Sequence, residues 1–216
     1  MSKKVLVILS GSGVYDGTEI HEAVISLLAL ARAGATVVCA APNKNQMHVI
    51  NHATGEVMDE KRNVLVEAAR ISRGNIQDLA DINIADFDAV FLPGGFGAAK
   101  NLCTFATEGD ACTIDDNVER VLQGFHAAQK PIGAVCIAPA VVVRAINGVN
   151  VTIGNDAGTA AALASMGGQH TDHNVDECHV DTQNRVVTAP AYMIDTGIAQ
   201  VATGIEAAVG ALISMA

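Results

Sequence analysis

Residues 133–140 constrain the fold of this chain more than any other segment. A turn at Lys130 and Pro131 leads into a short apolar run that ends at Cys136, and a helix-compatible run with Pro139 in its first turn follows at once. This order predicts a strand, a sharp turn and a helix, with the Cys136 thiol at the apex. The same geometry forms the nucleophile elbow of hydrolases, and the positive end of a helix dipole there favours thiolate over thiol. The alternative is a buried cysteine that serves only as a small hydrophobe.

The composition fits an α/β domain with a large core. Of the 216 residues, 50% are hydrophobic and only 3% are aromatic, so the apolar mass is Ala, Val, Ile and Leu, which suits a parallel sheet buried under helices. We expect residues 1–216 to form one domain. The net charge of -10, with no basic block, argues against a nucleic-acid partner and against binding to an anionic membrane surface.

The N-terminal segment and the pattern of cysteines predict a cytoplasmic protein. The apolar run after Lys3 and Lys4 reaches only Leu9, which is too short for a signal peptide, and no stretch is expected to reach the length of a membrane span. The five cysteines are irregularly spaced and form no Cys-x-x-Cys pair. Free thiols in a reducing compartment are the simpler interpretation.

Strand and helix patterns alternate along the chain. We expect strands over residues 4–10, 35–40, 89–92 and 151–153, and a hairpin formed by residues 177–180 and 185–188. We expect helices over residues 19–33, 63–73 and 198–214, a helix after residue 113 with a capping box of Thr113 and Asp116, and a small helix before residue 167. The inward face of the first helix is predicted to carry Ile20, Ala23, Val24, Leu27, Leu28 and Ala31. This order predicts an α/β layered fold with a mainly parallel sheet.

Three unusual loops should meet at one edge of that sheet. They are residues 11–18, residues 93–100 and the turn at Cys136, and each follows a predicted strand. Ligands bind beyond the carboxyl ends of parallel strands, so this convergence favours a nucleophile over a buried structural thiol. The glycine spacing in residues 11–17 does not fit a dinucleotide fingerprint, and no acidic residue ends the second strand, so no nicotinamide or flavin cofactor is expected.

Residues near that edge are predicted to differ in chemical role, from proton transfer to oxyanion binding. Glu22 lies beside a core-facing position, and a carboxyl next to a thiolate would have a raised pKa and could move a proton. Glu19 is expected to act only as a partner of the helix dipole. The turn at Gly94, Gly95 and Phe96 can present backbone N–H groups to an oxyanion, together with the N–H of Ile137.

Five stretches carry a resemblance to a known family: residues 13–23, 62–70, 93–101, 133–140 and 188–193. On these the chain resembles the ThiJ/PfpI branch of the class I glutamine-amidotransferase-like superfamily, and within it the bacterial enhancing-lycopene-biosynthesis group. The resemblance implies a flavodoxin-like three-layer sandwich, Cys136 on the elbow, Glu22 as the carboxylate that contacts the thiol, an oxyanion loop at Gly94 and Gly95, and a homodimer.

Two departures from the family pattern limit the chemistry. A glutaminase would need a second glycine where Ala138 stands and a His-x-Glu pair near the last helix, which residues 189–191 lack, so ammonia release from glutamine is not expected. Many relatives also carry a histidine near the thiol. Here Ile137 follows the cysteine, and the later position holds Gly154 and Asn155, so Asn155 is predicted to lie near the thiol. The site then resembles a Cys-Glu dyad, and brisk hydrolysis is not expected.

The remaining histidines predict no metal site. His170, His173 and His179 lie near acidic residues, but their spacing fits no familiar ligand pattern, and no metal is expected.

The family resemblance implies a slow, cofactor-free and glutathione-independent glyoxalase that converts small 2-oxoaldehydes such as glyoxal or methylglyoxal to hydroxy acids. The alternatives are a redox-responsive cysteine protein that affects isoprenoid biosynthesis, and a protein deglycase that uses the same residues.

Overall fold

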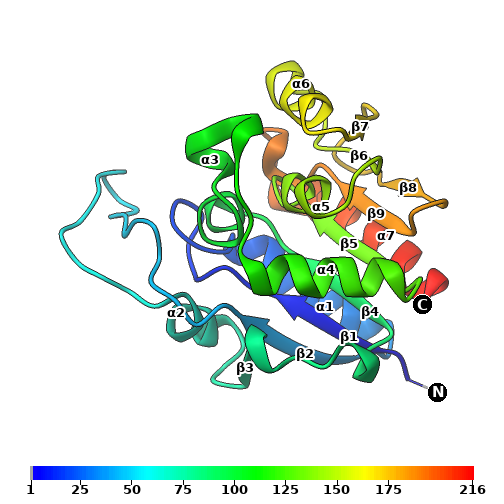
Figure 1. The fold of residues 1–216 in the computed structure, drawn as a ribbon, viewed down its shortest axis with the longest axis horizontal. Coiled ribbons are helices and arrows are strands. Elements are labelled where there is room, and N and C mark those ends of the chain that lie inside the picture. The colour runs from blue at the N-terminus through cyan, green and yellow to red at the C-terminus, as the bar shows by residue number, and fades with distance from the viewer. Residues whose placement is uncertain (1) are drawn as a thin grey trace.

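The computed structural model describes residues 2–216. A 7-stranded sheet forms its centre (Figure 1). In sheet order the strands are β3 (Ile76–Asp78), β2 (Thr36–Ala41), β1 (Lys4–Ile8), β4 (Ala89–Leu92), β5 (Ile132–Val135), β9 (Val186–Ala189) and β8 (His179–Asp181). Every neighbouring pair is parallel except β8 and β9, which form the expected antiparallel hairpin. The prediction of a mainly parallel sheet is therefore confirmed.

Helices cover both faces of this sheet. The helices are α1 (Ile20–Arg32), α2 (Val64–Ile71), α3 (Phe105–Glu108), α4 (Asp116–Ala127), α5 (Pro139–Ala145), α6 (Ala157–Ser165) and α7 (Ile198–Met215). Helices α1, α2 and α7 pack on one face, and α4 and α5 pack on the other (Figure 1). These layers form the flavodoxin-like sandwich that the resemblance implies. Two short parallel strands, β6 (Asn150–Val151) and β7 (Gln169–His170), form a separate small sheet beside α6.

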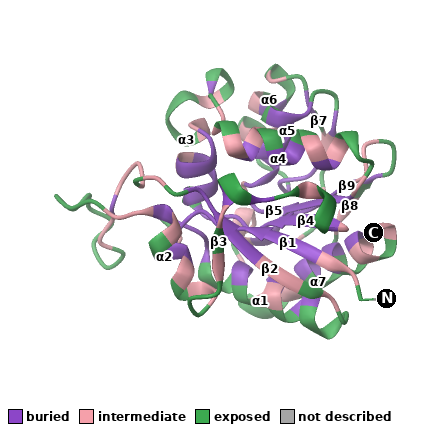
Figure 2. Ribbon diagram, turned by 60° about the horizontal axis from the view of Figure 1, so that its bottom comes forward, coloured by how far each residue is buried: buried purple, intermediate pink, exposed green. Residues whose placement is uncertain are grey.

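The apolar runs are buried on both faces, as parallel strands under helices must be. In β1 and the residue after it, Val5, Val7 and Leu9 face the α1 and α7 layer, whereas Leu6 and Ile8 face the α4 and α5 layer. All five side chains are fully buried. Figure 2 shows this burial as a purple centre with exposed residues on the outer faces of the helices.

Several local predictions were wrong. Ile20, Val24 and Leu28 are 46%, 50% and 46% exposed, because α1 turns Glu22 and Ser26 inward in their place. Ala23 is buried, as predicted. The buried face of α1 therefore includes polar residues that a search for apolar periodicity does not count.

The start of α4 also differs from the prediction. Asp115, and not Thr113, is its N-cap, because the Asp115 carboxylate accepts hydrogen bonds from the N–H groups of Asn117 and Val118. Strand β3 was not predicted at all, since it is only 3 residues long.

The last helix tests the expectation that no segment is long enough to span a membrane. Helix α7 is 18 residues long with a mean hydropathy of 1.5, so the expectation that no stretch approaches the length of a span was wrong. Length and composition alone are weak evidence, because the core helix of a soluble protein passes the same test. One face of α7, with Val201, Ile205 and Leu212, packs in the core against α1, β5 and β9.

Residues 42–62 leave the body of the protein after β2. In Figure 1 they form the cyan segment that extends away from the sheet. Single antiparallel bridges join Asn45 to Asn63 and Ile50 to Val57, so a minimal hairpin exists where a small one was expected. Ile50 and His52 of this segment hydrogen-bond to the loop after β1, whose Val14 lines the candidate site.

Candidate active site around Cys136

The Cys136 thiol lies at the tip of a strained turn. The residue follows β5 directly and has φ +61, the left-handed region that costs a residue with a Cβ about 1–3 kcal/mol. Its N–H donates to the Ala189 carbonyl over 3.0 Å, which holds the turn against β9. Helix α5 begins with Pro139 in its first turn. The predicted order of strand, turn and helix is confirmed, and the thiol lies at the carboxyl edge of the sheet.

The carboxyl of Glu22 is buried against this thiol. Glu22 belongs to the first turn of α1 and is 0% exposed. One carboxylate oxygen accepts the N–H of Gly94 at 2.9 Å, and the other accepts the N–H of Tyr192 at 3.3 Å. The Cys136 side chain also hydrogen-bonds to this carboxyl. Three segments of the chain therefore fix one carboxyl group in a single orientation.

Burial changes the acidity of both groups. Desolvation, with the charge of Glu19 adding to it, raises the pKa of Glu22 from 4.5 to about 7. Burial and the Glu22 charge raise the pKa of Cys136 well above its ordinary value, although N–H groups of Gly95 and Ile137 act in the opposite direction. The prediction of a low thiol pKa from the helix dipole was therefore wrong. Helix α5 has only 7 residues, and its dipole does not outweigh burial beside a carboxylate.

The turn after β4 can approach the thiol only because it is made of glycine. A Cβ on Gly94 would lie 2.5 Å from the Cys136 Cβ and 2.7 Å from a Glu22 carboxylate oxygen. Gly95 has φ +93, and a Cβ there would lie 2.4 Å from the Glu19 nitrogen. This turn directs the Gly95 N–H at the Cys136 sulfur, to which the Ile137 N–H also points. The two donors form a small anion-binding concavity beside the sulfur.

A cavity of about 490 Å³ opens onto the thiol. Most of its lining is apolar and includes Val14, Phe96, Ala99, Phe105, Ile137 and Met193. The charged groups that line it are the carboxylates of Glu19 and Asp156, and the lining includes no lysine, arginine or histidine. Hydrogen bonds from Thr159 lower the pKa of Asp156, so this carboxylate is ionised at neutral pH. The cavity consequently combines an apolar wall with a negative potential.

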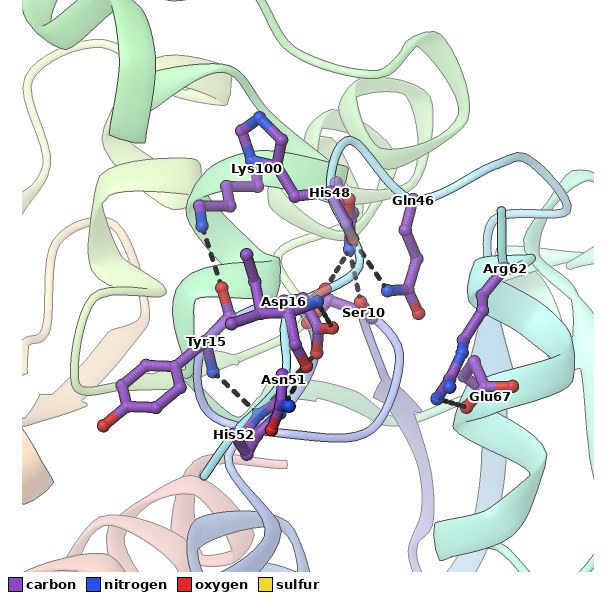
Figure 3. A network of polar contacts seen from close by, with 12 residues as sticks. Ser10, Tyr15, Asp16, Gln46, His48, Asn51, His52, Arg62, Glu67 and Lys100 are labelled. Atoms are coloured by element: carbon purple, nitrogen blue, oxygen red, sulfur yellow. Dashed lines mark hydrogen bonds and ion pairs between the residues drawn. The ribbon is translucent and has the colours of Figure 1, made fainter. Parts of the chain in front are cut away.

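A network of polar contacts holds the loop that carries Val14. Figure 3 shows Asp16, Tyr15, His52 and Lys100 within it. The Asp16 carboxylate accepts the N–H of Ile50 at 2.7 Å, the His52 ring accepts the N–H of Tyr15 at 3.2 Å, and Lys100 donates to the Tyr15 carbonyl at 2.8 Å. The protruding segment is thereby tied to the loop that follows β1, which fixes the Val14 wall of the cavity.

The structure places the predicted residues in two groups. Cys136, Glu22, Gly94, Gly95 and Ile137 lie together, and Phe96, 48% exposed, lines the cavity mouth. Asn155 does not line this cavity: it is exposed and borders a separate surface hollow with His173 and Glu177. Its neighbour Asp156 faces the thiol cavity instead. The alignment by which a relative's histidine would fall on Asn155 therefore misplaces that residue.

The histidine cluster is a hydrogen-bonded surface group. The His173 and His179 rings lie 3.1 Å apart at their nearest nitrogens, and His170 faces Asp172 at 3.4 Å. Within residues 2–216 no group of three or more His, Cys, Asp or Glu side chains could hold a metal ion.

Three contributors to the site were missed by sequence reasoning. Tyr192 lines the cavity, donates its N–H to Glu22 and hydrogen-bonds through its hydroxyl to His21 at 2.9 Å. Glu19 is the N-cap of α1, where it accepts the Glu22 N–H at 2.6 Å, and it also lines the cavity. Phe105, in the short helix α3, forms a further wall. The turn signal at Pro190, just before Tyr192, could have drawn attention to the first of these.

Comparison with known proteins identifies the family to which this chain belongs. The chain matches the DJ-1/PfpI family over residues 3–195. It belongs to this family. The mitochondrial ES1 protein homolog of Rattus norvegicus is 50% identical, with the match covering 95% of this chain and 81% of that protein. The mitochondrial glutamine amidotransferase-like class 1 domain-containing protein 3 of Homo sapiens matches to the same extent, also at 50% identity. The resemblance to the ThiJ/PfpI branch is therefore confirmed.

A solved structure agrees closely with this fold. An isoprenoid biosynthesis protein with an amidotransferase-like domain from Ehrlichia chaffeensis superposes with a TM-score of 0.93 at 39% identity, over 99% of each chain. The cytoplasmic location expected from the sequence is contradicted, because both curated relatives are named as mitochondrial proteins. The apolar run after Lys3 forms strand β1, Lys4–Ile8, and a buried strand carries no information about compartment.

Proposed function

We propose that this protein is a cofactor-free glyoxalase that converts 2-oxoaldehydes to 2-hydroxy acids through a thiol adduct on Cys136. One observation carries the proposal: a buried carboxyl with a pKa near 7 hydrogen-bonds to a thiol that faces a cavity and two backbone N–H donors. A group whose pKa lies near neutrality can both accept and return a proton, which is what an internal transfer of hydrogen requires.

The first step is addition of the thiol to the aldehyde. At rest the thiol proton is directed at the Glu22 carboxylate, because burial and the carboxylate charge oppose a free thiolate. As sulfur bonds to the aldehyde carbon, Glu22 takes up that proton. The negative charge that develops on the aldehyde oxygen lies beside the N–H groups of Gly95 and Ile137. Return of the proton to this oxygen gives a neutral hemithioacetal.

The second step moves hydrogen between the two carbons. The Glu22 carboxylate removes the proton from the former aldehyde carbon, which leaves an enediolate with its negative charge on the former ketone oxygen. The same group returns this proton to the adjacent carbon, and the hydroxyl proton of the hemithioacetal passes to the former ketone oxygen, so that the carbonyl now lies on the carbon bonded to sulfur. The product is a thioester of the 2-hydroxy acid on Cys136. Water then cleaves the carbon–sulfur bond, which releases the acid and restores the thiol. No electrons leave the substrate, so no redox cofactor is needed.

The cavity sets the range of aldehydes that fit. Methylglyoxal has five heavy atoms, which occupy at most roughly 150 Å³ if each takes the volume of a water molecule. The cavity of about 490 Å³ leaves room for a larger apolar substituent. Because Glu19 and Asp156 make it negative, aldehydes that carry a carboxylate or phosphate should be poor substrates. Glyoxal, methylglyoxal and phenylglyoxal form a suitable size series.

A peroxide sensor based on Cys136 receives less support. The thiolate reacts with peroxides, and both the burial of Cys136 and the charge of Glu22 oppose thiolate formation. Repair of glycated protein would use the same Cys136–Glu22 dyad. However, Val14, Phe105 and Met193 line the cavity around the thiol, which favours a small-molecule substrate over a glycated side chain that is still attached to a protein.

Product analysis tests the proposal. The full chain is incubated with glyoxal or methylglyoxal, and glycolate or lactate is measured by chromatography. Cys136→Ser should abolish product formation, whereas Cys39→Ser, which alters a buried thiol in β2, should not. Absence of hydroxy acid with the wild-type chain, or equal yields from the two variants, would overturn the proposal.

The biological setting is proposed from the relatives. The names of the rat and human proteins suggest mitochondria, where reactive 2-oxoaldehydes would meet this chain. The Ehrlichia protein is described as an isoprenoid biosynthesis protein, which suggests that aldehyde removal or a related thiol reaction supports that route. The predicted homodimer remains an expectation of the family resemblance.

A further inference from the structure

We propose that His21 is a positioning residue: it holds the Tyr192 side chain, and Tyr192 holds the Glu22 carboxyl in its orientation beside the thiol. The value of this clamp for catalysis rests on the proposed function, but the contacts that form it do not. The Tyr192 N–H donates to Glu22 at 3.3 Å, and the Tyr192 hydroxyl lies 2.9 Å from the Nδ1 of His21. Because His21 and Glu22 are neighbours in the first turn of α1, Tyr192 is attached to that turn at two points.

The two attachment points lie at different depths in the protein. Glu22 is 0% exposed, whereas the side chain of His21 is 54% exposed. The Tyr192 ring lines the cavity, and it meets the His21 ring at an angle of 49° with the ring centroids 5.8 Å apart. The hydroxyl contact therefore fixes the outer end of Tyr192, and the N–H contact fixes its inner end against the buried carboxyl.

The outer contact persists over the pH range in which Glu22 titrates. Burial, with the charges of Glu19 and Glu22 adding to it, raises the pKa of Tyr192, so the phenol keeps its proton. In either neutral tautomer of His21 one of the two groups donates and the other accepts. When the ring is protonated, Nδ1 donates to the hydroxyl oxygen and also faces the Glu19 carboxylate, 4.0 Å away.

The segment that carries Tyr192 needs this outer attachment. It is a single 3-10 turn, Ala191–Met193, and Ala191 has φ +46, a left-handed conformation that is unfavourable for a residue with a Cβ. The Tyr192 N–H is also the more distant donor to Glu22, at 3.3 Å, because the Gly94 N–H donates at 2.9 Å. Without the hydroxyl contact we expect the strained turn to relax and this longer bond to weaken first.

A weaker bond from Tyr192 changes the proton affinity of Glu22. Burial and the charge of Glu19 raise the pKa of Glu22, and the Tyr192 N–H acts against them because it stabilises the carboxylate. The other groups that face this carboxyl, the Cys136 thiol and the Gly94 N–H, stay in place when the outer contact is lost. Hydrogen bonds to charged groups are strong, so partial loss of this one should make the proton bind about 3- to 10-fold more tightly.

Carboxyl NMR measures this affinity directly. The full chain is produced with glutamate isotope-labelled at Cδ, the Glu22 signal is identified by its loss in Glu22→Gln, and its chemical shift is followed with pH. Tyr192→Phe removes only the hydroxyl, and His21→Phe removes its partner. Each should move the midpoint of the Glu22 titration to higher pH. The double variant should move it no further than either single variant, because both remove the same contact.

Two further variants separate the contact from the charge of the imidazole. His21→Asn places an amide atom where Nδ1 lies but carries no charge, so it should restore the wild-type midpoint. His126→Phe removes a histidine that contacts Asn184 from α4, on the other face of the sheet, and should leave the midpoint unchanged.

None of these titrations uses an aldehyde, so their outcome is separate from that of product analysis. The proposal is overturned if Tyr192→Phe leaves the Glu22 midpoint where it is in the wild type. It is also overturned if the shifts of the two single variants add in the double variant, or if His21→Asn titrates like His21→Phe.

Discussion

The change Glu22→Gln gives a direct thermodynamic test of the buried carboxyl. Burial, with the Glu19 charge, raises the pKa of Glu22 from 4.5 to about 7, so the folded protein holds this proton more tightly than the unfolded chain does. The contribution of Glu22 to the free energy of unfolding is therefore fully present below the unfolded value of 4.5 and is lost as pH rises through about 7.

The size of the effect follows from the two pKa values. Each pKa unit is worth about 1.36 kcal/mol, so the wild type loses about 3 kcal/mol in all, of which about 2.5 kcal/mol falls between about pH 5 and pH 8. Glutamine does not titrate. The stability of Glu22→Gln relative to the wild type should accordingly increase by about 2.5 kcal/mol over that interval, whatever constant cost the amide adds by leaving one N–H unpaired.

Urea unfolding followed by circular dichroism measures this difference at each pH, with the protein concentration held fixed. Glu67→Gln is the matched control, because it removes a second buried carboxylate that pairs with Arg70 and lies away from the cavity. This control shows the effect of a carboxylate-to-amide change made away from the Cys136 cavity. If the Glu22→Gln and wild-type curves run parallel, Glu22 does not bind a proton more tightly in the folded state, and the acid–base argument for the site loses its foundation.

Three more outcomes are expected. Glu22→Gln should lower aldehyde turnover by about 10²-fold while it speeds the reaction of Cys136 with iodoacetamide, because the carboxylate that opposes the thiolate is gone; slower alkylation contradicts this. Gly94→Ala should destabilise the fold by about 1–3 kcal/mol in thermal unfolding and abolish turnover, since its Cβ would overlap the Cys136 Cβ and the Glu22 carboxylate. Gly210→Ala, with open space around it, should do neither. The ratio of the alkylation rate with neutral iodoacetamide to that with anionic iodoacetate should be higher for Cys136 than for a free thiol, because the cavity is negative. Asp156→Asn should lower this ratio, and an unchanged ratio would show that the Asp156 carboxylate does not act on the cavity.

Local chemistry explains why part of the site was predictable. The order of apolar run, cysteine and proline in residues 132–139 has few structural solutions, so the elbow could be placed before any coordinates were known. The glycines at 94 and 95 end a buried strand, and the topology of a parallel sheet brings such strand ends together. Glu22 was found through its place in the first turn of α1 and through the family resemblance.

The acidity of the thiol could not be predicted in the same way. The helix dipole is a local feature that the sequence suggests, but burial and the contact with Glu22 arise only when α1 and the β5 turn pack together. These two effects raise the pKa, and they outweigh the dipole of a short helix.

The sequence by itself determined the layered α/β architecture, the position of the thiol on its turn and the family, because each depends on patterns within a few neighbouring residues. The tertiary structure alone decided which face of α1 is buried, that Asp156 and not Asn155 faces the cavity, and that Tyr192 completes the carboxyl's hydrogen bonds. The contact between Tyr192 and Glu22 joins segments 170 residues apart in the chain. The energies of these features come from desolvation and from contacts that exist only after packing, which no local pattern records.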